Sequence, residues 1–151
     1  MRKLAQGLTL GAAMTVAATG VASAQTPGSR TVIAPATVLA LNAHGQVIHA
    51  ARAKSTIQFA IRFALPASFP SGYTDIRFEI LIHKHVERSI IYGTPKHVHP
   101  RDTVHLSVTS TVSKLWLGTI TVRGTIRLLA KPGGSALGYE GQGSTPLTVT
   151  R

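Results

Sequence analysis

Four of the seven histidines form two alternate pairs, and these are the residues whose type and spacing suggest the most specific chemistry. His83 pairs with His85, and His97 pairs with His99. In an extended strand, residues i and i+2 point to the same face about 7 Å apart, so each pair could direct two imidazoles at one ion. Because the sequence contains no cysteine, these ligands favour Cu(II) or Zn(II). The alternative interpretation is four ordinary histidines on wet strand faces.

The triplet from His97 to His99 resembles the copper-ligand triplet of copper–zinc superoxide dismutases. The match covers three residues, and the glycine-rich metal loop and the disulfide cysteines of that family are absent from this sequence. Dismutase activity is therefore not implied. We expect no resident cofactor other than Cu(II) or Zn(II) at the four histidines.

Arginines at alternate strand positions form a second candidate site. Arg123 and Arg127 alternate with apolar residues, and Arg62 and Arg77 hold the same outward position on their own segments. The planar guanidinium group suits phosphate and carboxylate, and an excess of positive charge attracts polyanions. We therefore expect these four arginines to form a basic sheet face that binds anionic polysaccharide, lipopolysaccharide or a membrane surface. The alternative is that the charges only solubilise the domain and protect exposed strand edges.

Catalysis finds little support among the remaining polar residues. The five acidic residues are scattered, and the sequence has neither a nucleophile elbow nor a phosphate-binding glycine loop. Sequence-specific nucleic-acid binding is not expected either, because several of the few aromatic residues are needed for the core and cannot form a stacking platform. We therefore expect a binding protein without enzymatic activity.

An alternation of apolar and polar residues with a period of two predicts the strands that position these side chains. The clearest candidates are 57–63, 76–82, 104–109 and 120–128, and weaker ones are 31–41, 46–51, 88–92 and 146–150. The sequence predicts an all-β fold. More specifically, we expect a small antiparallel β-sandwich, immunoglobulin-like or Greek-key, of about seven or eight strands.

Turn-forming residues separate these segments. Asn42 to Gly45 predicts a hairpin turn, because Asn and Gly tolerate positive φ. Glycines and one proline crowd the stretch 131–143, for which we expect a mobile loop before the last strand.

The first 24 residues have the pattern of a cleavable export signal. Arg2 and Lys3 precede a short apolar run, which ends in the small residues Ala22-Ser23-Ala24. We expect cleavage before Gln25, a single domain over 25–151, and a periplasmic or secreted location in a bacterium. Removing Arg2 and Lys3 would lower the net charge from +11 to +9. No later run approaches the roughly 20 apolar residues of a transmembrane helix.

A third hypothesis, after anion and metal binding, is a structural subunit of a surface assembly. The apolar segment 31–41 could pair with the sheet edge of a neighbouring copy, as donor strands do. The alternative is an ordinary first strand of the chain's own fold.

Overall fold

The computed structural model describes residues 30–92 and 94–151 of the 151-residue chain. The expected signal peptide and its cleavage site lie outside the described residues. Within them the secondary structure consists of strands and one 3-10 turn, so the all-β prediction is confirmed. No helix in this described part is long and apolar enough to cross a membrane.

The described residues contain ten strands, more than the seven or eight expected. Two of them, β5 and β9, are only two or three residues long, and the expected segment 31–41 is divided into β3 and β4. The elements are β3 (Val32–Pro35), β4 (Thr37–Leu41), β5 (Ala50–Arg52), β6 (Thr56–Ala64), β7 (Gly72–Ile82), β8 (His85–Tyr92), β9 (His97–Val98), β10 (Thr103–Thr111), η4 (Lys114–Trp116), β11 (Gly118–Leu129) and β12 (Ala136–Thr150).

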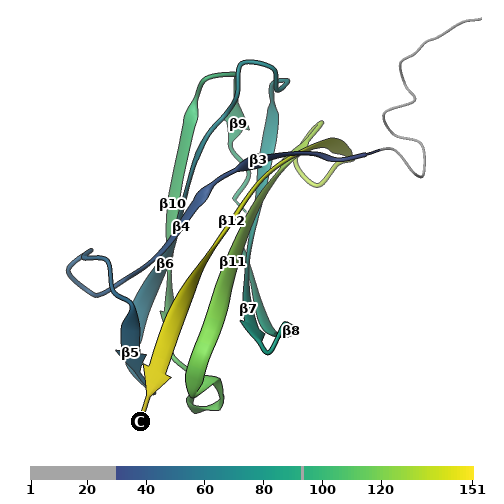
Figure 1. Ribbon diagram of the computed structural model, residues 1–151. Coiled ribbons are helices and arrows are strands. Elements are labelled where there is room, and N and C mark those ends of the chain that lie inside the picture. The colour runs from purple at the N-terminus through teal and green to yellow at the C-terminus, as the bar shows by residue number, and fades with distance from the viewer. Residues whose placement is uncertain (1–29, 93) are drawn as a thin grey trace, which may run out of the picture.

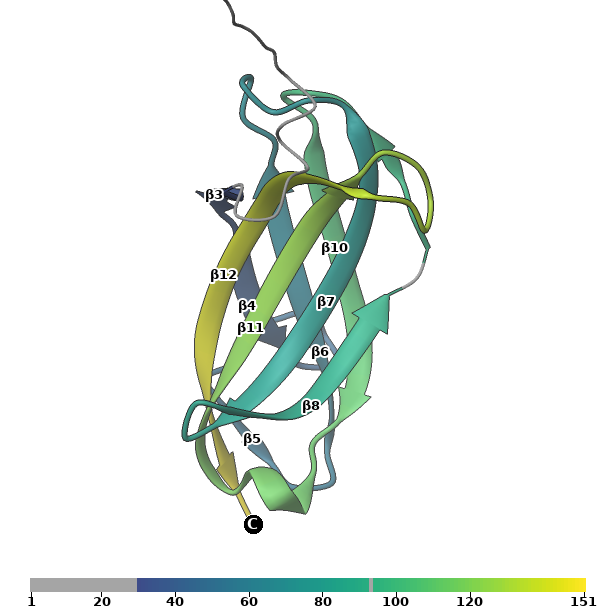
Figure 2. The same ribbon diagram turned by 90° about the vertical axis from the view of Figure 1, so that its right-hand side faces the viewer.

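The strands form two sheets, which Figures 1 and 2 show from perpendicular directions. The smaller sheet has the order β10-β6-β4. The larger sheet has the order β3-β12-β11-β7-β8, with β5 paired to β12 and β9 paired to β7. Most pairs are antiparallel, but β3 and β5 both run parallel to β12. The expectation of a purely antiparallel fold is therefore wrong along this edge, because strand polarity depends on how the chain connects rather than on alternation.

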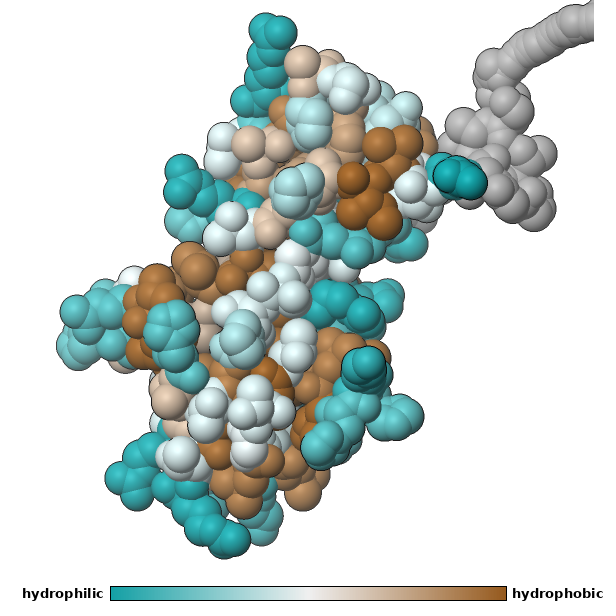
Figure 3. Space-filling view, viewed as in Figure 1, coloured by the Kyte–Doolittle hydropathy of each residue, from teal (hydrophilic) through white to brown (hydrophobic). Residues whose placement is uncertain are grey.

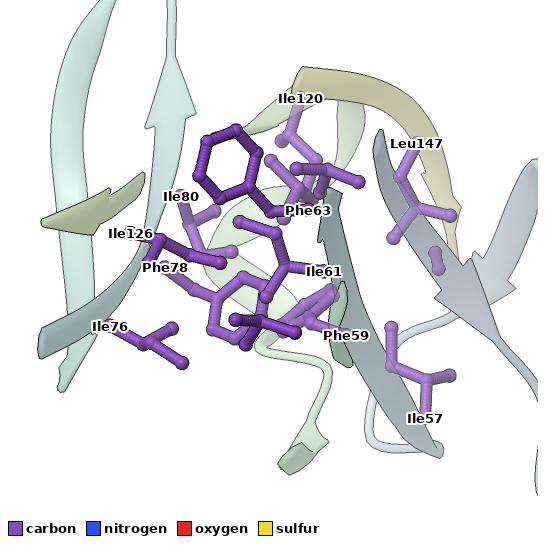
Figure 4. Close-up of a cluster of buried hydrophobic side chains, with 14 of the residues drawn as sticks. Ile57, Phe59, Ile61, Phe63, Ile76, Phe78, Ile80, Ile120, Ile126 and Leu147 are labelled. Carbon is purple, nitrogen blue, oxygen red and sulfur yellow. The ribbon is translucent and has the colours of Figure 1, made fainter. Parts of the chain in front are cut away.

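Both sheets contribute to one hydrophobic core. Phe59, Ile61 and Phe63 come from β6, and they meet apolar side chains of the larger sheet such as Phe78 and Ile126. All five are at most 1% exposed. Figure 4 shows these side chains gathered between the strands. The residues that alternate with these core positions point outward. Those of the smaller sheet and those of the larger sheet therefore lie on opposite sides of the molecule.

The chain crosses from one sheet to the other at Ala36, between β3 and β4, and its backbone N–H donates to the carbonyl oxygen of Gln142 at 2.7 Å. A Cβ on Gly143 would overlap the backbone oxygen of Ala36, and one on Gly141 would lie 2.6 Å from the ring of Phe63. The mobile loop expected over 131–143 is therefore wrong beyond residue 135. Ala136–Thr150 is one long strand, whose glycines admit the crossing chain and an aromatic ring.

Pro146 lies within this long strand, although proline usually interrupts a sheet. β3 pairs with residues 139–142 of β12 and β5 with residues 148–150, so Pro146 falls in the gap between them. Thr148 donates its N–H to His49 on the side away from β11. Residue 146 is two positions away, so its backbone nitrogen also faces away from β11. The N–H that proline lacks is therefore not needed for the pairing of β12 with β11.

Candidate functional site

Three of the four predicted arginines share the outer face of the larger sheet, toward which Figure 2 looks. The strand register places Arg123 opposite Glu79 and Arg127 opposite Asp75, with Arg77 in the row between them. Arg62 lies instead on β6, in the smaller sheet. The prediction of one face with four arginines is therefore wrong for Arg62. Alternation predicts which residues point outward, but it does not predict which sheet a strand joins.

Carboxylates neutralise the three arginines. Arg123 donates from Nε and Nη2 to Oε1 of Glu79 at 3.0 and 2.6 Å, and Nη2 of Arg127 donates to Oδ2 of Asp75 at 2.6 Å. The Nη1 atom of Arg77 lies 3.9 Å from Oε2 of Glu79. Each arginine side chain is 42–49% exposed, so each pair contributes no more than about 1 kcal/mol of stability.

These side chains line a hollow of about 360 Å³, which we call the outer groove. Its lining residues are Asp75, Arg77, Glu79, Arg123, Thr125, Arg127, Glu140 and Gln142. The Nε2 atom of Gln142 donates to Oε1 of Glu140 at 2.9 Å, which holds the third carboxylate at the rim. Three arginines against Asp75, Glu79 and Glu140 give a formal charge of zero. The expected basic face is therefore charge-balanced, and an anion there would have to compete with carboxylates already in place.

The two histidine pairs lie at opposite ends of β7. His83 and Lys84 have φ values of 50° and 70° and form the two-residue turn between β7 and β8, where Ile82 pairs with His85. β9, which carries His97, pairs with Gly72 and Tyr73 at the other end. Ten residues of strand separate these ends, which corresponds to about 33 Å. The prediction of one site made by all four histidines is therefore wrong.

His97 and His99 do lie close together. Their ring centroids are 4.6 Å apart, and the ring of Tyr73 lies 4.7 Å from that of His97. Ser71 Oγ and His99 Nδ1 are 3.0 Å apart, while the carboxylate of Asp102 accepts from the backbone N–H of His99. That carboxylate caps a turn and does not orient the imidazole ring, so this is not the geometry of a Ser-His-Asp triad. In the described ranges no three His, Asp or Glu residues are placed to hold a metal ion.

A surface that the sequence reasoning missed lies at the end of the molecule near η4. A hollow of about 500 Å³ is lined there by Ala53, Lys54, Lys114, Leu115, Leu117 and Arg151. Arg52 joins the group, since its Nε donates to the backbone oxygen of Arg151 at 3.2 Å. We call Arg52, Lys54, Lys114, Leu115, Leu117 and Arg151 the η4 surface.

The η4 surface was hard to predict because its residues come from three separate segments of the chain. One local signal was available. Leu115 and Leu117 flank Trp116 at alternate positions, so burying the tryptophan turns both leucines outward.

Comparison with known proteins gives no family assignment. No protein-family model matches the sequence, and no curated protein is significantly similar to it. Among solved structures, the chain is similar to Spo0M, a sporulation control protein from Bacillus subtilis. The TM-score is 0.45 and the identity 12%, over 78% of this chain and 50% of that one. The chain thus spans about half the length of this structure.

Proposed function

We propose that this chain is an exported, non-enzymatic β-sandwich protein that binds the phosphate or carboxylate groups of an anionic envelope surface. The cations that bind would be those outside the outer groove. Export itself is part of the proposal, and it rests on the pattern of residues 1–24.

One observation supports the proposal: few of the basic side chains have an Asp or Glu side chain as a partner. Of the 16 basic residues, Arg2 and Lys3 lie outside the described residues, which leaves 14. Three of these, Arg77, Arg123 and Arg127, have a side-chain carboxylate within 4.0 Å in the described part of the chain. The other eleven are Arg30, Arg52, Lys54, Arg62, Lys84, Arg88, Lys96, Arg101, Lys114, Lys131 and Arg151.

Such unbalanced charge attracts a polyanion and is screened over about 8 Å at physiological salt. Binding should therefore weaken steeply as salt rises, because each neutralised phosphate or carboxylate releases counterions.

The test measures binding of the purified protein to two kinds of anionic surface, with phosphate and carboxylate presented separately. One is phosphatidylcholine vesicles with and without phosphatidylglycerol, and the other is polygalacturonate. We expect salt-sensitive binding to an anionic surface and none to neutral vesicles. Absence of binding to both anionic probes at low salt would overturn the proposal.

Two double variants test which cations matter. Replacing Glu79 and Arg123 together by Gln removes an ion pair of the outer groove at constant net charge, so we expect unchanged affinity. Replacing Arg62 and Arg88 together by Gln removes two charges without a carboxylate partner, so affinity should fall. The reverse ranking would show that the outer groove is the binding site.

A further inference from the structure

The η4 surface combines exposed apolar side chains with positive charge. Leu115 is 67% exposed and Leu117 is 41% exposed. Figure 3 shows hydrophobic surface between hydrophilic side chains at this lower end of the molecule, where the chain ends in Figure 1. Exposed apolar groups of this size, surrounded by charges, are typical of an interaction surface.

The two leucines are held outward by a fixed turn. Trp116, between them, is 1% exposed and its ring lies 6.5 Å from that of Phe59 in the core. The Oγ atom of Ser113 accepts from the N–H of Leu115 at 3.1 Å, which caps the turn. Because the tryptophan anchors the turn, the leucines cannot fold back onto the core.

The charged side chains around the leucines are all positive. In the part of the chain that the structure describes, no Asp or Glu side chain lines the hollow or lies within 4.0 Å of Arg52, Lys54, Lys114 or Arg151. Lys54 stands on a turn with φ of 73°, and Lys114 immediately precedes Leu115. Four like charges would repel the same surface of a second copy, which disfavours self-association through this end.

We propose that the η4 surface docks on an anionic lipid bilayer. Leu115 and Leu117 would enter the boundary between headgroups and acyl chains, and the four cations would lie against lipid phosphates. This inference rests on the proposed function and commits it to one partner. A hydrated polysaccharide offers phosphate or carboxylate but no apolar layer for the two leucines, whereas a bilayer offers both.

The single tryptophan provides a direct probe of this orientation. Trp116 lies between the two leucines in the chain, so docking by the η4 surface brings it close to the acyl chains. Phosphatidylglycerol vesicles with brominated acyl chains should therefore quench its fluorescence on binding. Docking by any other face would leave the tryptophan remote from the bromines.

Variants separate the apolar contribution from the electrostatic one. Replacing Leu115 and Leu117 together by Ala should weaken vesicle binding on the order of tenfold, abolish quenching and leave a fully salt-sensitive remainder. Replacing Lys54 and Lys114 by Gln should weaken it about fivefold for each charge. The matched control for the leucines is Val86→Ala with Ile91→Ala, similarly exposed on β8, which should leave binding and quenching unchanged. The comparison for the lysines is Arg62→Gln with Arg88→Gln, which should weaken binding less and leave the quenching intact. Circular dichroism confirms that each variant is folded.

The outcomes distinguish this inference from the proposed function. Salt-sensitive vesicle binding without quenching, or with no effect of the leucine changes, would overturn docking by the η4 surface and leave anion binding intact. Binding to polygalacturonate but not to vesicles would overturn the lipid partner. Binding to neither would remove both proposals.

Discussion

His97 and His99 face each other at the end of β7 where β9 pairs, and they are what the structure retains of the predicted metal site. The two rings are 4.6 Å apart, whereas His83 and His85 lie at the far end of the same strand. Two imidazoles can hold a divalent ion only weakly, and Lys96 and Arg101 stand on either side of the pair in the sequence.

We therefore expect weak Cu(II) binding that depends on one histidine pair. His97→Ala should abolish it because one of the two nitrogens is lost, and His85→Ala should leave it unchanged. Calorimetric titration of both variants and of the unchanged protein provides the measurement. An equal loss in both variants would mean that the ends of β7 are brought together, in contradiction to the sheet register.

At the scale of residues, the sequence predicted which arginine side chains point outward, but it did not predict which carboxylates lie beside them. Arg77, Arg123 and Arg127 do point outward, as alternation requires, and Asp75 and Glu79 alternate on the same strand as Arg77. What alternation cannot supply is the register between β7 and β11, which sets Glu79 beside Arg123. The cancellation of charge in the outer groove is a property of that register.

At the scale of elements, the glycines of β12 determine how the two sheets are joined. Gly143 lies directly under the crossing at Ala36 and pairs across the strands with Gly124. A Cβ on Gly124 would lie 2.8 Å from a methyl group of Val38. These glycines leave the room in which β4 approaches the larger sheet.

Gly143→Ala should destabilise the fold by about 1–3 kcal/mol, because the new methyl group collides with backbone that cannot move aside cheaply. The neighbouring Ser144 is exposed on the outer face, and Ser144→Ala should change the free energy of unfolding by no more than about 0.5 kcal/mol. Urea denaturation of both variants compares them. Similar midpoints would show that the backbone at Ala36 is free to shift.

The core strands were predictable because their alternation is strong, and β6, β7, β10 and β11 appear where the pattern places them. The turn at Asn42–Gly45 is also present, with Asn42 Oδ1 accepting from the N–H groups of His44 and Gln46. The end of β12 was predicted at 146–150, but its first part was missed because a glycine in a close-packed strand and a glycine in a loop have the same local sequence. Only the approach of Ala36 and Phe63 distinguishes them.

At the scale of the whole molecule, segment 31–41, for which a donor-strand role was the third hypothesis, forms strand pairs within its own chain. β3 pairs with residues 139–142 of β12, and β4 pairs with β6. The backbone groups of 31–41 that would pair with a neighbouring copy therefore already have partners in the same chain. They support the interpretation of 31–41 as an ordinary first strand, although one shared between two sheets.

Deleting residues 25–35 should therefore promote association. Removal of β3 leaves four residues of β12 without their edge partner, and an unpaired edge recruits strands from other molecules. Light scattering should give a concentration-independent monomer mass for the unchanged protein and a rising mass for the truncated one. A concentration-dependent mass for the unchanged protein would instead favour the assembly-subunit hypothesis.

The pairing of β3 and β5 with β12 also affects the order in which the strand pairs can form during folding. Residues 32–35 and 50–52 must wait for residues 139–150, which lie about 100 residues further along the chain, before they gain these strand partners. Contacts between such distant parts of a chain form slowly, because a long loop must be ordered before any of them is made. The parallel edge is therefore among the last parts of the fold to form, whereas β4 and β6 lie close together in the chain and can pair before β12 is present.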